Sequence, residues 1–448
     1  PSSPIMKLLT ISALVSLTWA CVLPEERIGG SSSRLGRRQT TGNTGIPVGT
    51  GDRFNDGKEL PLGVGTQNKA VTSVLSVKEI ESGFRALASH YKFQTFEAPQ
   101  KTYEGRSVFG GKVGGNGTCN DAYRVYLNGA IHARERGSAD GVLFFVADLL
   151  YANEKNTGIT YGRKSYTNAD VKKALSAGLV FVPLSNPDGV AYDQATNSCW
   201  RKNRNPRSAR AGDDSTIGVD LNRNFDFLWD FPKEFAPSAA SSVASTDPSS
   251  EVFHGTSAFS EPETQNIKWV LDTYKKVRWF VDLHSYTGDV LYSWGSDTNQ
   301  QKYDYMNFHN SSYNDVRGIV NDVPGRGRGY GEYTPASEDS VNQGAAKRMG
   351  DAMSAANGRR YTVSQAVGLY PTSGSSDDYS YSRHFTDPSL NLVHGYTVEF
   401  GFGNNAVPDC PFYPSESQHN DNLREIGAGF METLLAAVDL GLGDATKC

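Results

Sequence analysis

The pattern of apolar and polar positions predicts strands and helices in alternation from about Val71 onward. Residues 123–127 alternate in polarity, as a strand with one buried face does, whereas residues 179–184 and 279–283 are dense apolar runs typical of strands covered on both faces. Two further stretches carry apolar residues at helical spacing and predict helices. Their stripes are Val142, Phe145, Val146 and Leu149, then Leu423, Ile426, Phe430, Leu434 and Val438. We therefore expect a fold of the α/β class.

The beginning of the chain has the pattern of a secretory signal. An apolar stretch at residues 8–20 follows Met6, and it is too short to span a bilayer. We expect a signal peptide over residues 1–20, with extra residues before Met6, and therefore a secreted protein. A lipid anchor on Cys21 is the alternative, but the bulky Trp19 disfavours it.

The next segments predict processing and a boundary. The dibasic pair at residues 37–38 favours a second cleavage, which makes residues 21–38 a short propeptide. Residues 39–70 are rich in Gly, Thr and Asn and poor in large apolar side chains, so we expect a flexible linker before a domain at residues 71–448. Within that domain, residues 230–250 are rich in Ser, Ala and Pro and predict a surface excursion without chemistry.

Composition excludes some partners. The 448 residues include 44 basic and 49 acidic side chains, for a net charge of -5, and no basic block stands out. We therefore expect no nucleic-acid partner. No second apolar stretch is long enough for a membrane span. The oligomeric state has no signature in the sequence.

The cysteines predict disulfide bonds. After residue 38 an even set remains, and this fits an oxidising compartment. The set is Cys119, Cys199, Cys410 and Cys448. Three pairings are open to four cysteines, and of these we expect Cys119 with Cys199 and Cys410 with Cys448.

Three residues have the chemistry of a metal site. His132 and Glu135 are three positions apart, and His284 closes the apolar run at residues 279–283. Open α/β sheets gather such side chains at the carboxyl ends of their strands. Two imidazoles and one carboxylate hold Zn²⁺ with one coordination position open for a reactive water. The sequence thus predicts a hydrolase that uses one zinc ion.

By itself the pair of His132 and Glu135 is weak evidence for a metal site. An isolated His-x-x-Glu is common, and a lone histidine after a strand is more often a core residue than a ligand. Here the pair stands among further motifs. They are Asn186-Pro187-Asp188-Gly189, Cys199-Trp200-Arg201, Asp220-Leu221-Asn222-Arg223, Phe253-His254-Gly255, His284-Ser285-Tyr286, Leu369-Tyr370-Pro371, Ser376-Asp377-Asp378-Tyr379 and Glu399-Phe400. In this order, over about residues 76–444, they resemble the zinc metallocarboxypeptidases of the A/B type.

The resemblance implies a single large domain, with a mixed, mostly parallel twisted β-sheet and helices on both faces. It also implies the catalytic parts. His132, Glu135 and His284 would bind zinc, and Asp220 would accept a hydrogen bond from the outer nitrogen of His132. Glu399 would be the general base and acid, and Arg201 would stabilise the oxyanion.

The resemblance further implies a substrate, the C-terminus of a peptide or protein. Arg223, Asn222 and Tyr370 would hold its carboxylate. Arg134, Ser285 and Tyr286 would line neighbouring subsites. Asp377 lies where basic-specific members carry an acid, as in carboxypeptidase B, which predicts a preference for C-terminal Lys or Arg.

Three alternatives remain open at this point. Asp377 can turn aside or meet water, which leaves a broad or an aromatic and aliphatic preference. The chain can be a catalytically silent relative that binds peptide ends, although the ligands, Glu399 and Arg201 are all present. A serine hydrolase is the third, and no Gly-x-Ser-x-Gly motif supports it. Propeptide control of the pancreatic kind is not expected, because residues 21–38 are too few for a folded activation domain.

Overall fold

The computed structural model describes residues 22, 26, 44–115, 117 and 119–443. The predicted signal peptide and the dibasic site lie outside these residues. The strands are β1 (Gln94–Glu97), β2 (Phe109–Val113), β3 (Val125–Gly129), β4 (Ile159–Tyr161), β5 (Lys164–Tyr166), β6 (Leu179–Val182), β7 (Trp279–Ser285), β8 (Asp289–Tyr292), β9 (Asn299–Gln300), β10 (Glu332–Tyr333), β11 (Thr362–Gln365) and β12 (His394–Phe400).

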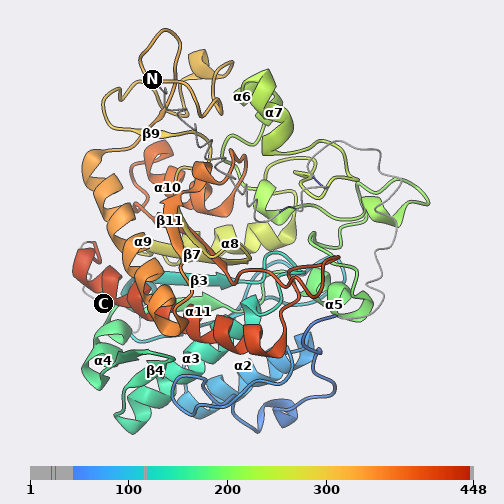
Figure 1. Cartoon of the computed structure of the whole chain (residues 1–448), viewed down its shortest axis with the longest axis vertical. Helices are drawn as coiled ribbons and strands as arrows, with labels where there is room; N and C mark the ends of the chain where they lie inside the picture. The colour runs from blue at the N-terminus through green and yellow to red at the C-terminus, as the bar shows by residue number, and fades with distance from the viewer. Residues whose placement is uncertain (1–21, 23–25, 27–43, 116, 118, 444–448) are drawn as a thin grey trace, which may run out of the picture.

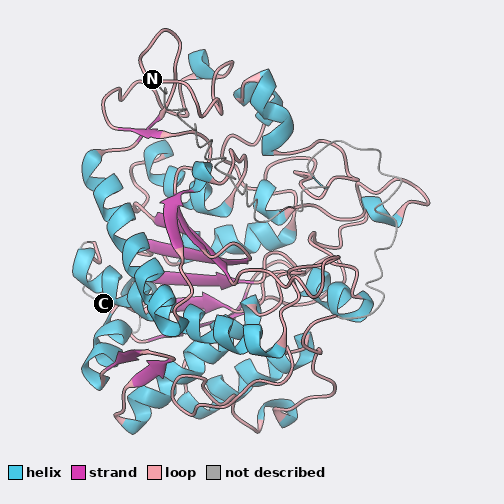
Figure 2. Ribbon diagram, viewed as in Figure 1, coloured by secondary structure: helices cyan, strands magenta, loops and turns pink. Residues whose placement is uncertain are grey.

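Helices surround the strands on both sides (Figure 1; Figure 2). The α-helices are α2 (Val77–Tyr91), α3 (Ser138–Lys155), α4 (Asn168–Ser176), α5 (Pro187–Thr196), α6 (Phe231–Glu234), α7 (Pro237–Val243), α8 (Pro262–Thr273), α9 (Ala336–Asn357), α10 (Ser376–Thr386) and α11 (Glu416–Leu440). Short 3-10 turns are η2 (Asn55–Gly57), η3 (Asn120–Ala122), η4 (Asp214–Thr216), η5 (Leu221–Arg223), η6 (Ser311–Tyr313) and η7 (Ala366–Gly368).

Eight of the strands form one mixed sheet in the order β1-β2-β6-β3-β7-β12-β8-β11. The central strands β6, β3, β7 and β12 run parallel, whereas β2 and β8 pair antiparallel with β6 and β12. The carboxyl ends of the four parallel strands therefore lie at one edge. This architecture confirms the predicted fold.

The sheet separates two hydrophobic cores, because successive side chains of a strand point to opposite faces. On β7, Val281 and Leu283 pack into one core with α2, α3, α4, α9 and α11, and Phe280 packs into the other with α8 and α10. We call the first the helix-covered apolar face and the second the site face. Burial on both sides explains why the β7 run is apolar almost throughout.

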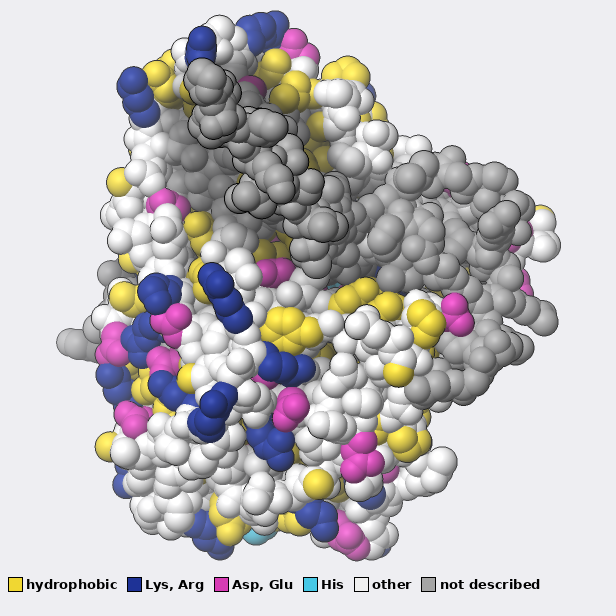
Figure 3. All heavy atoms as spheres, in the orientation of Figure 1, with side chains coloured by type: hydrophobic (Ala, Val, Ile, Leu, Met, Phe, Trp, Pro, Cys, Tyr) yellow, Lys and Arg dark blue, Asp and Glu magenta, His cyan; other side chains and the backbone are white. Residues whose placement is uncertain are grey.

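The two predicted helical stripes are confirmed. In α3 the four stripe residues are at most 1% exposed, and in α11 the stripe residues Leu423, Ile426, Phe430 and Leu434 are at most 2% exposed, while Val438 is half-buried. A capping box begins α11: the Ser415 hydroxyl accepts from the Gln418 backbone, and the Gln418 side chain accepts from Ser415. Over α9 and α11, basic and acidic side chains are interspersed (Figure 3), and some pair, such as Arg348 with Glu432 at 2.8 Å.

Residues 44–70 differ from the expected flexible linker. Ile46, Phe54 and Val64 are buried, and Phe54 and Val64 belong to the core of the apolar face. The backbone of Thr66 donates to the buried Asp148 carboxylate at 2.7 Å. A few apolar residues spaced along a Gly-rich segment are enough to fix it when a preformed core accepts them. The boundary at residue 71 therefore does not mark the start of the folded part.

Residues 230–250 are also more than a surface excursion. Phe231, Phe235 and Val243 are buried in the core of the site face. The carbonyl of Val243 accepts a hydrogen bond from Arg223 Nε at 2.8 Å. This segment thus supports a residue of the predicted site, which its Ser-rich composition concealed.

The expected disulfide pairing is wrong. Cys199 is bonded to Cys410, 211 residues later. Cys119 is also in a disulfide. Spacing along the chain carried no information on which loops the fold brings together, so sequence reasoning had no basis for choosing. Within the described residues, no helix has the length and apolar character to cross a membrane.

Candidate metal centre

Three strands deliver the predicted metal site to one edge of the sheet. His132 and Glu135 follow β3, and His284 is the penultimate residue of β7. Glu399 lies on β12 directly beside His284, since the two are paired in the parallel register. The strand alternation places both on the site face, because their neighbours Leu283 and Val398 belong to the opposite core.

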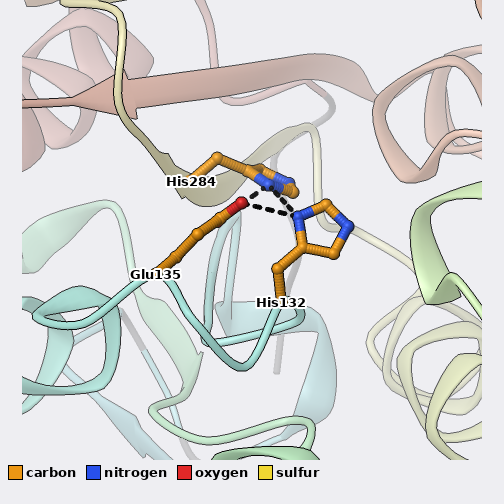
Figure 4. A group of neighbouring side chains, drawn as sticks. All are labelled: His132, Glu135 and His284. Carbon is orange, nitrogen blue, oxygen red and sulfur yellow. Dashed lines mark hydrogen bonds and ion pairs between the residues drawn. The ribbon is translucent and has the colours of Figure 1, made fainter. Parts of the chain in front are cut away.

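The side chains of His132, Glu135 and His284 converge (Figure 4). His132 Nδ1 lies 2.8 Å from Glu135 Oε1 and 3.1 Å from His284 Nδ1. His284 Nδ1 lies 3.2 Å from Glu135 Oε2. All three residues are buried.

This set fits a zinc ion. Ligands about 2.0–2.1 Å from a tetrahedral zinc lie roughly 3.3 Å from one another, close to the separations found here. The two Nδ1 atoms face each other, which is unfavourable for two neutral acceptors and favourable when both donate electron pairs to one cation. Two imidazoles and one carboxylate leave a position for a water or substrate oxygen.

Carboxylates orient both imidazoles from outside. His132 Nε2 donates to Asp220 Oδ1 at 2.9 Å, as predicted, and His284 Nε2 lies 3.3 Å from Asp282 Oδ2. Asp282 was not predicted from the sequence, because it lies within the apolar run of β7. The signal was its position two residues before His284, which places both side chains on one face of β7.

Electrostatics at this centre favour bound cations. Burial by itself would lower the pKa of His284, but the charges of Asp282 and Glu135 outweigh it and raise the pKa well above its usual range. The pKa of Glu135 is lowered, because the charges of His132 and His284 outweigh its burial. Zinc binds the deprotonated forms of imidazole and carboxylate, so the affinity of this centre for zinc should fall at acidic pH.

Arg201 lies beside the same centre. Its Nη2 donates to Asp220 Oδ2 at 2.9 Å, and its Nη1 is 3.9 Å from Glu135 Oε1. Asp220 thus contacts both Arg201 and His132, and the charges of these two residues lower its pKa despite burial. The buried Asp220 carboxylate therefore holds both His132, a predicted zinc ligand, and Arg201, the residue predicted to stabilise the oxyanion.

The residues predicted to clamp the substrate carboxylate lie near one another. Arg223 Nη2 lies 3.4 Å from the Tyr370 hydroxyl, although the two are 147 residues apart. Asn222 Oδ1 accepts from the backbone of Ser376 at 2.8 Å, which joins the Asn222 loop to the start of α10. Arg223 and Asn222 are buried, while Tyr370 is partly exposed.

Comparison with known proteins identifies the family. The family profile described as Zinc carboxypeptidase matches residues 80–426. The chain belongs to the zinc carboxypeptidase family. It is 34% identical over 199 residues to Zinc carboxypeptidase A 1 of Drosophila melanogaster, a match over 44% of this chain and 40% of that protein. It is 25% identical over 331 residues to Carboxypeptidase B of Astacus astacus, over 73% of this chain and 86% of that protein.

Solved structures show the same fold. The crystal structure of thrombin activatable fibrinolysis inhibitor aligns with 82% of this chain and 75% of its own, at 20% identity and a TM-score of 0.58. Carboxypeptidase A from Helicoverpa armigera aligns with 82% of this chain and 74% of its own, at 21% identity and a TM-score of 0.57. Zinc is the metal of this family, and the triad of His132, Glu135 and His284 is where this chain can hold it.

Two adjacent acids, Asp377 and Asp378, lie in the first turn of α10. Asp377 is 3% exposed and accepts from the Asp378 backbone at 2.9 Å and from the Thr397 hydroxyl at 3.2 Å. Asp378 accepts from the Gly295 backbone at 2.9 Å. Burial, and then the charge of Asp377, raises the pKa of Asp378 well above its usual range. Within the described residues, no salt bridge joins Asp377 to a basic side chain.

The residues predicted for neighbouring subsites form one wall. The Ser285 backbone donates to Glu135 Oε2 at 3.2 Å, and the Tyr286 ring lies 4.7 Å from the ring of Phe412. Phe412 lies 4.3 Å from the Arg134 guanidinium. Phe412 follows Cys410, so the disulfide to Cys199 joins this wall to the loop that carries Arg201. Sequence reasoning missed Phe412, because the short loop around it shows no periodic pattern.

Proposed function

We propose that this protein is a zinc-dependent carboxypeptidase that removes the C-terminal residue of peptides and proteins. The observation that carries the proposal is the pairing of the His132, Glu135 and His284 triad with Glu399 on the adjacent strand. A bound zinc ion supplies a Lewis acid that polarises the scissile carbonyl and acidifies a water molecule.

Glu399 is the proposed general base and acid. It takes a proton from the attacking water and delivers it to the amine that leaves. Arg201 stabilises the negative charge that develops on the carbonyl oxygen, and Asp220 holds its guanidinium in place through a contact of 2.9 Å. Removal of one such donor typically costs about 10²–10³-fold in rate.

Arg223, Asn222 and Tyr370 are the proposed clamp for the C-terminal carboxylate. The planar guanidinium of Arg223 suits a carboxylate, and it is anchored by the carbonyl of Val243 at 2.8 Å. Recognition of a free carboxylate limits cleavage to the end of a chain. Arg134, Ser285 and Tyr286 are proposed to contact residues further from the C-terminus.

The proposed preference is for C-terminal Lys or Arg, as in a B-type enzyme. A buried carboxylate that lacks a basic partner is costly, and a substrate cation would supply one. Asp377 fits this requirement because, among the described residues, the donors to its carboxylate are the neutral Thr397 hydroxyl and the Asp378 backbone. Secretion is proposed from the signal-like residues 1–20, and the Cys199–Cys410 disulfide supports an oxidising compartment.

The test compares second-order rate constants for blocked dipeptides ending in Arg, Lys, Phe or Leu, with and without a chelator. We expect chelator-sensitive release of Arg and Lys at least about tenfold faster than Phe. Asp377→Asn keeps the side-chain volume but removes the charge, so it should abolish this ratio. Thr397→Val is the matched control, because it removes a hydroxyl partner and leaves the charge.

Each outcome tests a separate part of the proposed function. Fast, chelator-sensitive release of Phe or Leu would retain the zinc enzyme and reject the basic preference. Release that ignores the chelator would reject the zinc mechanism. No release from any substrate, together with measurable peptide binding, would favour a catalytically silent relative.

A further inference from the structure

A buried carboxylate outside the metal centre holds the loop that carries Arg201. Asp193 lies in α5 and is 0% exposed. Its Oδ1 accepts hydrogen bonds from the Trp200 backbone at 2.9 Å and from the Tyr413 hydroxyl. The same hydroxyl accepts from the Cys199 backbone at 2.8 Å. The two residues immediately before Arg201 are therefore held by one carboxylate and one phenol.

The other oxygen of this carboxylate connects the loop to the metal centre. Asp193 Oδ2 lies 3.0 Å from Arg136 Nε and 2.9 Å from Arg136 Nη2. The Arg136 guanidinium also lies 3.5 Å from the Tyr413 ring, and Arg136 directly follows the proposed zinc ligand Glu135. The charged partner offsets the cost of burying the Asp193 carboxylate.

The backbone of the loop is unusual at the residue that these contacts hold. Cys199 has a φ of 57°, in the left-handed region that residues other than glycine seldom occupy. Such a conformation persists where the surrounding contacts impose it. Here they are the hydrogen bond to Tyr413 and the disulfide to Cys410. At the other end of the loop, the Arg201 carbonyl accepts from the Ala133 backbone at 3.0 Å. Contacts at both ends thus limit where the guanidinium can lie.

We infer that Asp193 is a positioning residue for the reaction: together with Tyr413, it fixes the backbone of residues 199–201 so that Arg201 faces the developing oxyanion. Asp220 holds the guanidinium itself, whereas Asp193 holds the loop. The inference rests on the proposed function, because it takes Arg201 to stabilise that charge. A misplacement of about 1 Å in such a group can cost about 10²-fold in rate. Asp193 acts through Arg201 and does not touch the substrate.

An amide cannot reproduce the contacts of this carboxylate. Asparagine has one acceptor oxygen, so its NH₂ group would face either the Arg136 guanidinium or the donors from Trp200 and Tyr413. Asp193→Asn therefore breaks the anchor with almost no change in volume. Tyr413→Phe is the milder variant, because it removes one hydroxyl and keeps the ring beside Arg136.

The first experiment measures kcat and KM for the blocked dipeptide that the parent protein cleaves fastest. We expect kcat to fall about 10–100-fold in Asp193→Asn and about 3–10-fold in Tyr413→Phe. KM should change less than about threefold, because the oxyanion exists only in the transition state. Unchanged kcat in both variants, or a loss confined to KM, would overturn the inference.

The chain offers a matched control for the loss of a buried carboxylate. Asp148 on α3 is 0% exposed, and it accepts from the Thr66 backbone at 2.7 Å and from the Tyr161 hydroxyl at 3.0 Å. Asp148→Asn and Tyr161→Phe should lower the midpoint of thermal unfolding, as the site variants do. They should leave kcat within about twofold of the parent protein, because they lie outside the site. If these controls lost as much kcat as Asp193→Asn, the inference would be rejected.

A double-mutant cycle separates positioning from a general structural role. Arg201→Ala alone should lower kcat by about 10²–10³-fold. In that background, Asp193→Asn should cost less than about twofold more, because its route to the reaction is already removed. An undiminished loss in the Arg201→Ala background would contradict the inference. If Asp193→Asn does not fold, Tyr413→Phe is used in the same cycle.

Zinc content tests the competing route through Arg136. If Asp193 acted on the reaction through Glu135, its replacement would release zinc. We expect Asp193→Asn to retain zinc near the content of the parent protein, as measured by elemental analysis. Loss of zinc from a folded Asp193→Asn protein would therefore overturn the role assigned to Arg201 in this inference.

Failure of the proposed function is distinguishable from failure of this inference. If no form of the protein cleaves any substrate, the proposed function fails. Amide hydrogen exchange at residues 199–201 then decides whether Asp193 holds the loop. Exchange at least about tenfold faster in Asp193→Asn than in Asp148→Asn supports the anchor, and equal exchange in the two variants rejects it.

Discussion

The two faces of the central sheet are built from the same strands and serve different purposes. On the helix-covered apolar face, β7 and β12 contribute Val281, Leu283, Tyr396, Val398 and Phe400 to one core. On the site face, the alternate positions are apolar near the start of each strand and polar near its carboxyl end.

The polar positions of the site face contact one another across strands. Asn128 on β3 donates to Asp282 on β7 at 2.9 Å, and Thr397 and Glu399 on β12 are paired with Asp282 and His284. Ser376, at the start of α10, donates to the same Asp282 at 2.6 Å. A rigid apolar face thus allows costly polar groups to be held in fixed positions on the other.

The largest effect expected from this comparison is at neighbouring residues of β12. Glu399→Gln should lower kcat by about 10³-fold, because it removes the proposed proton carrier. It should leave bound zinc near one ion per chain, as measured by elemental analysis. Val398→Ala should instead lower the free energy of unfolding by roughly 1–3 kcal/mol, because it deletes buried methyl groups.

The kinetics of Val398→Ala are the control for the comparison with Glu399→Gln. Its kcat/KM should stay within about twofold of the parent protein at a temperature where it is folded. Loss of turnover in a folded Val398→Ala protein would show that the two faces are not separable in this way.

The next prediction tests whether residues 44–70 belong to the core of the helix-covered apolar face. Phe54 is 4% exposed and packs into that core, although it precedes the expected domain boundary. Phe54→Ala should lower the free energy of unfolding by about 3 kcal/mol, as measured by denaturant titration. Leu62→Ala is the matched control, because Leu62 is 40% exposed and should change stability little. If both variants changed the free energy of unfolding equally little, residues 44–70 would not be part of the folded core.

A smaller effect is expected at the carboxylate that the sequence analysis missed. Asp282→Asn should weaken zinc binding by about 10–100-fold, because it removes the negative charge beside His284 Nε2. Competition with a chelator of known affinity measures this change. Asp272→Asn on α8 is the control, since Asp272 pairs with Lys268 and Arg383 and lies outside the metal centre. Unchanged zinc affinity in Asp282→Asn would show that Asp282 does not tune the site.

The smallest effect concerns pH. Burial, and then the charge of Glu261, raises the pKa of Glu263 on α8 to about 8. The folded state therefore holds a proton that the unfolded state releases above its ordinary pKa, so stability should fall as pH rises from about 4.5 to 8. Glu263→Gln should flatten this slope and stabilise the protein at pH 8 by about 1–2 kcal/mol. Thermal unfolding at pH 5 and pH 8 measures both values, and an unchanged slope in the variant would contradict the assignment.

The sequence by itself predicted several strands and helices and the residue types of a metal site. Periodicity predicted β7, α3 and α11, since a strand or helix that buries a whole face must carry apolar residues at the matching period. The motifs around His132, His284 and Glu399 were readable because metal and acid–base chemistry restrict which residue types can serve. Asp282, in contrast, was hidden within an apolar strand.

The tertiary structure alone decided which distant residues meet. It paired Cys199 with Cys410, packed Phe54 into the core, and brought Glu26 to Arg134. These contacts join segments between about 100 and 210 residues apart or bury isolated apolar residues, and neither leaves a periodic trace in the sequence. Local sequence fixes the geometry of a strand or helix, whereas long-range contacts depend on the packing of the whole sheet, which no local pattern encodes.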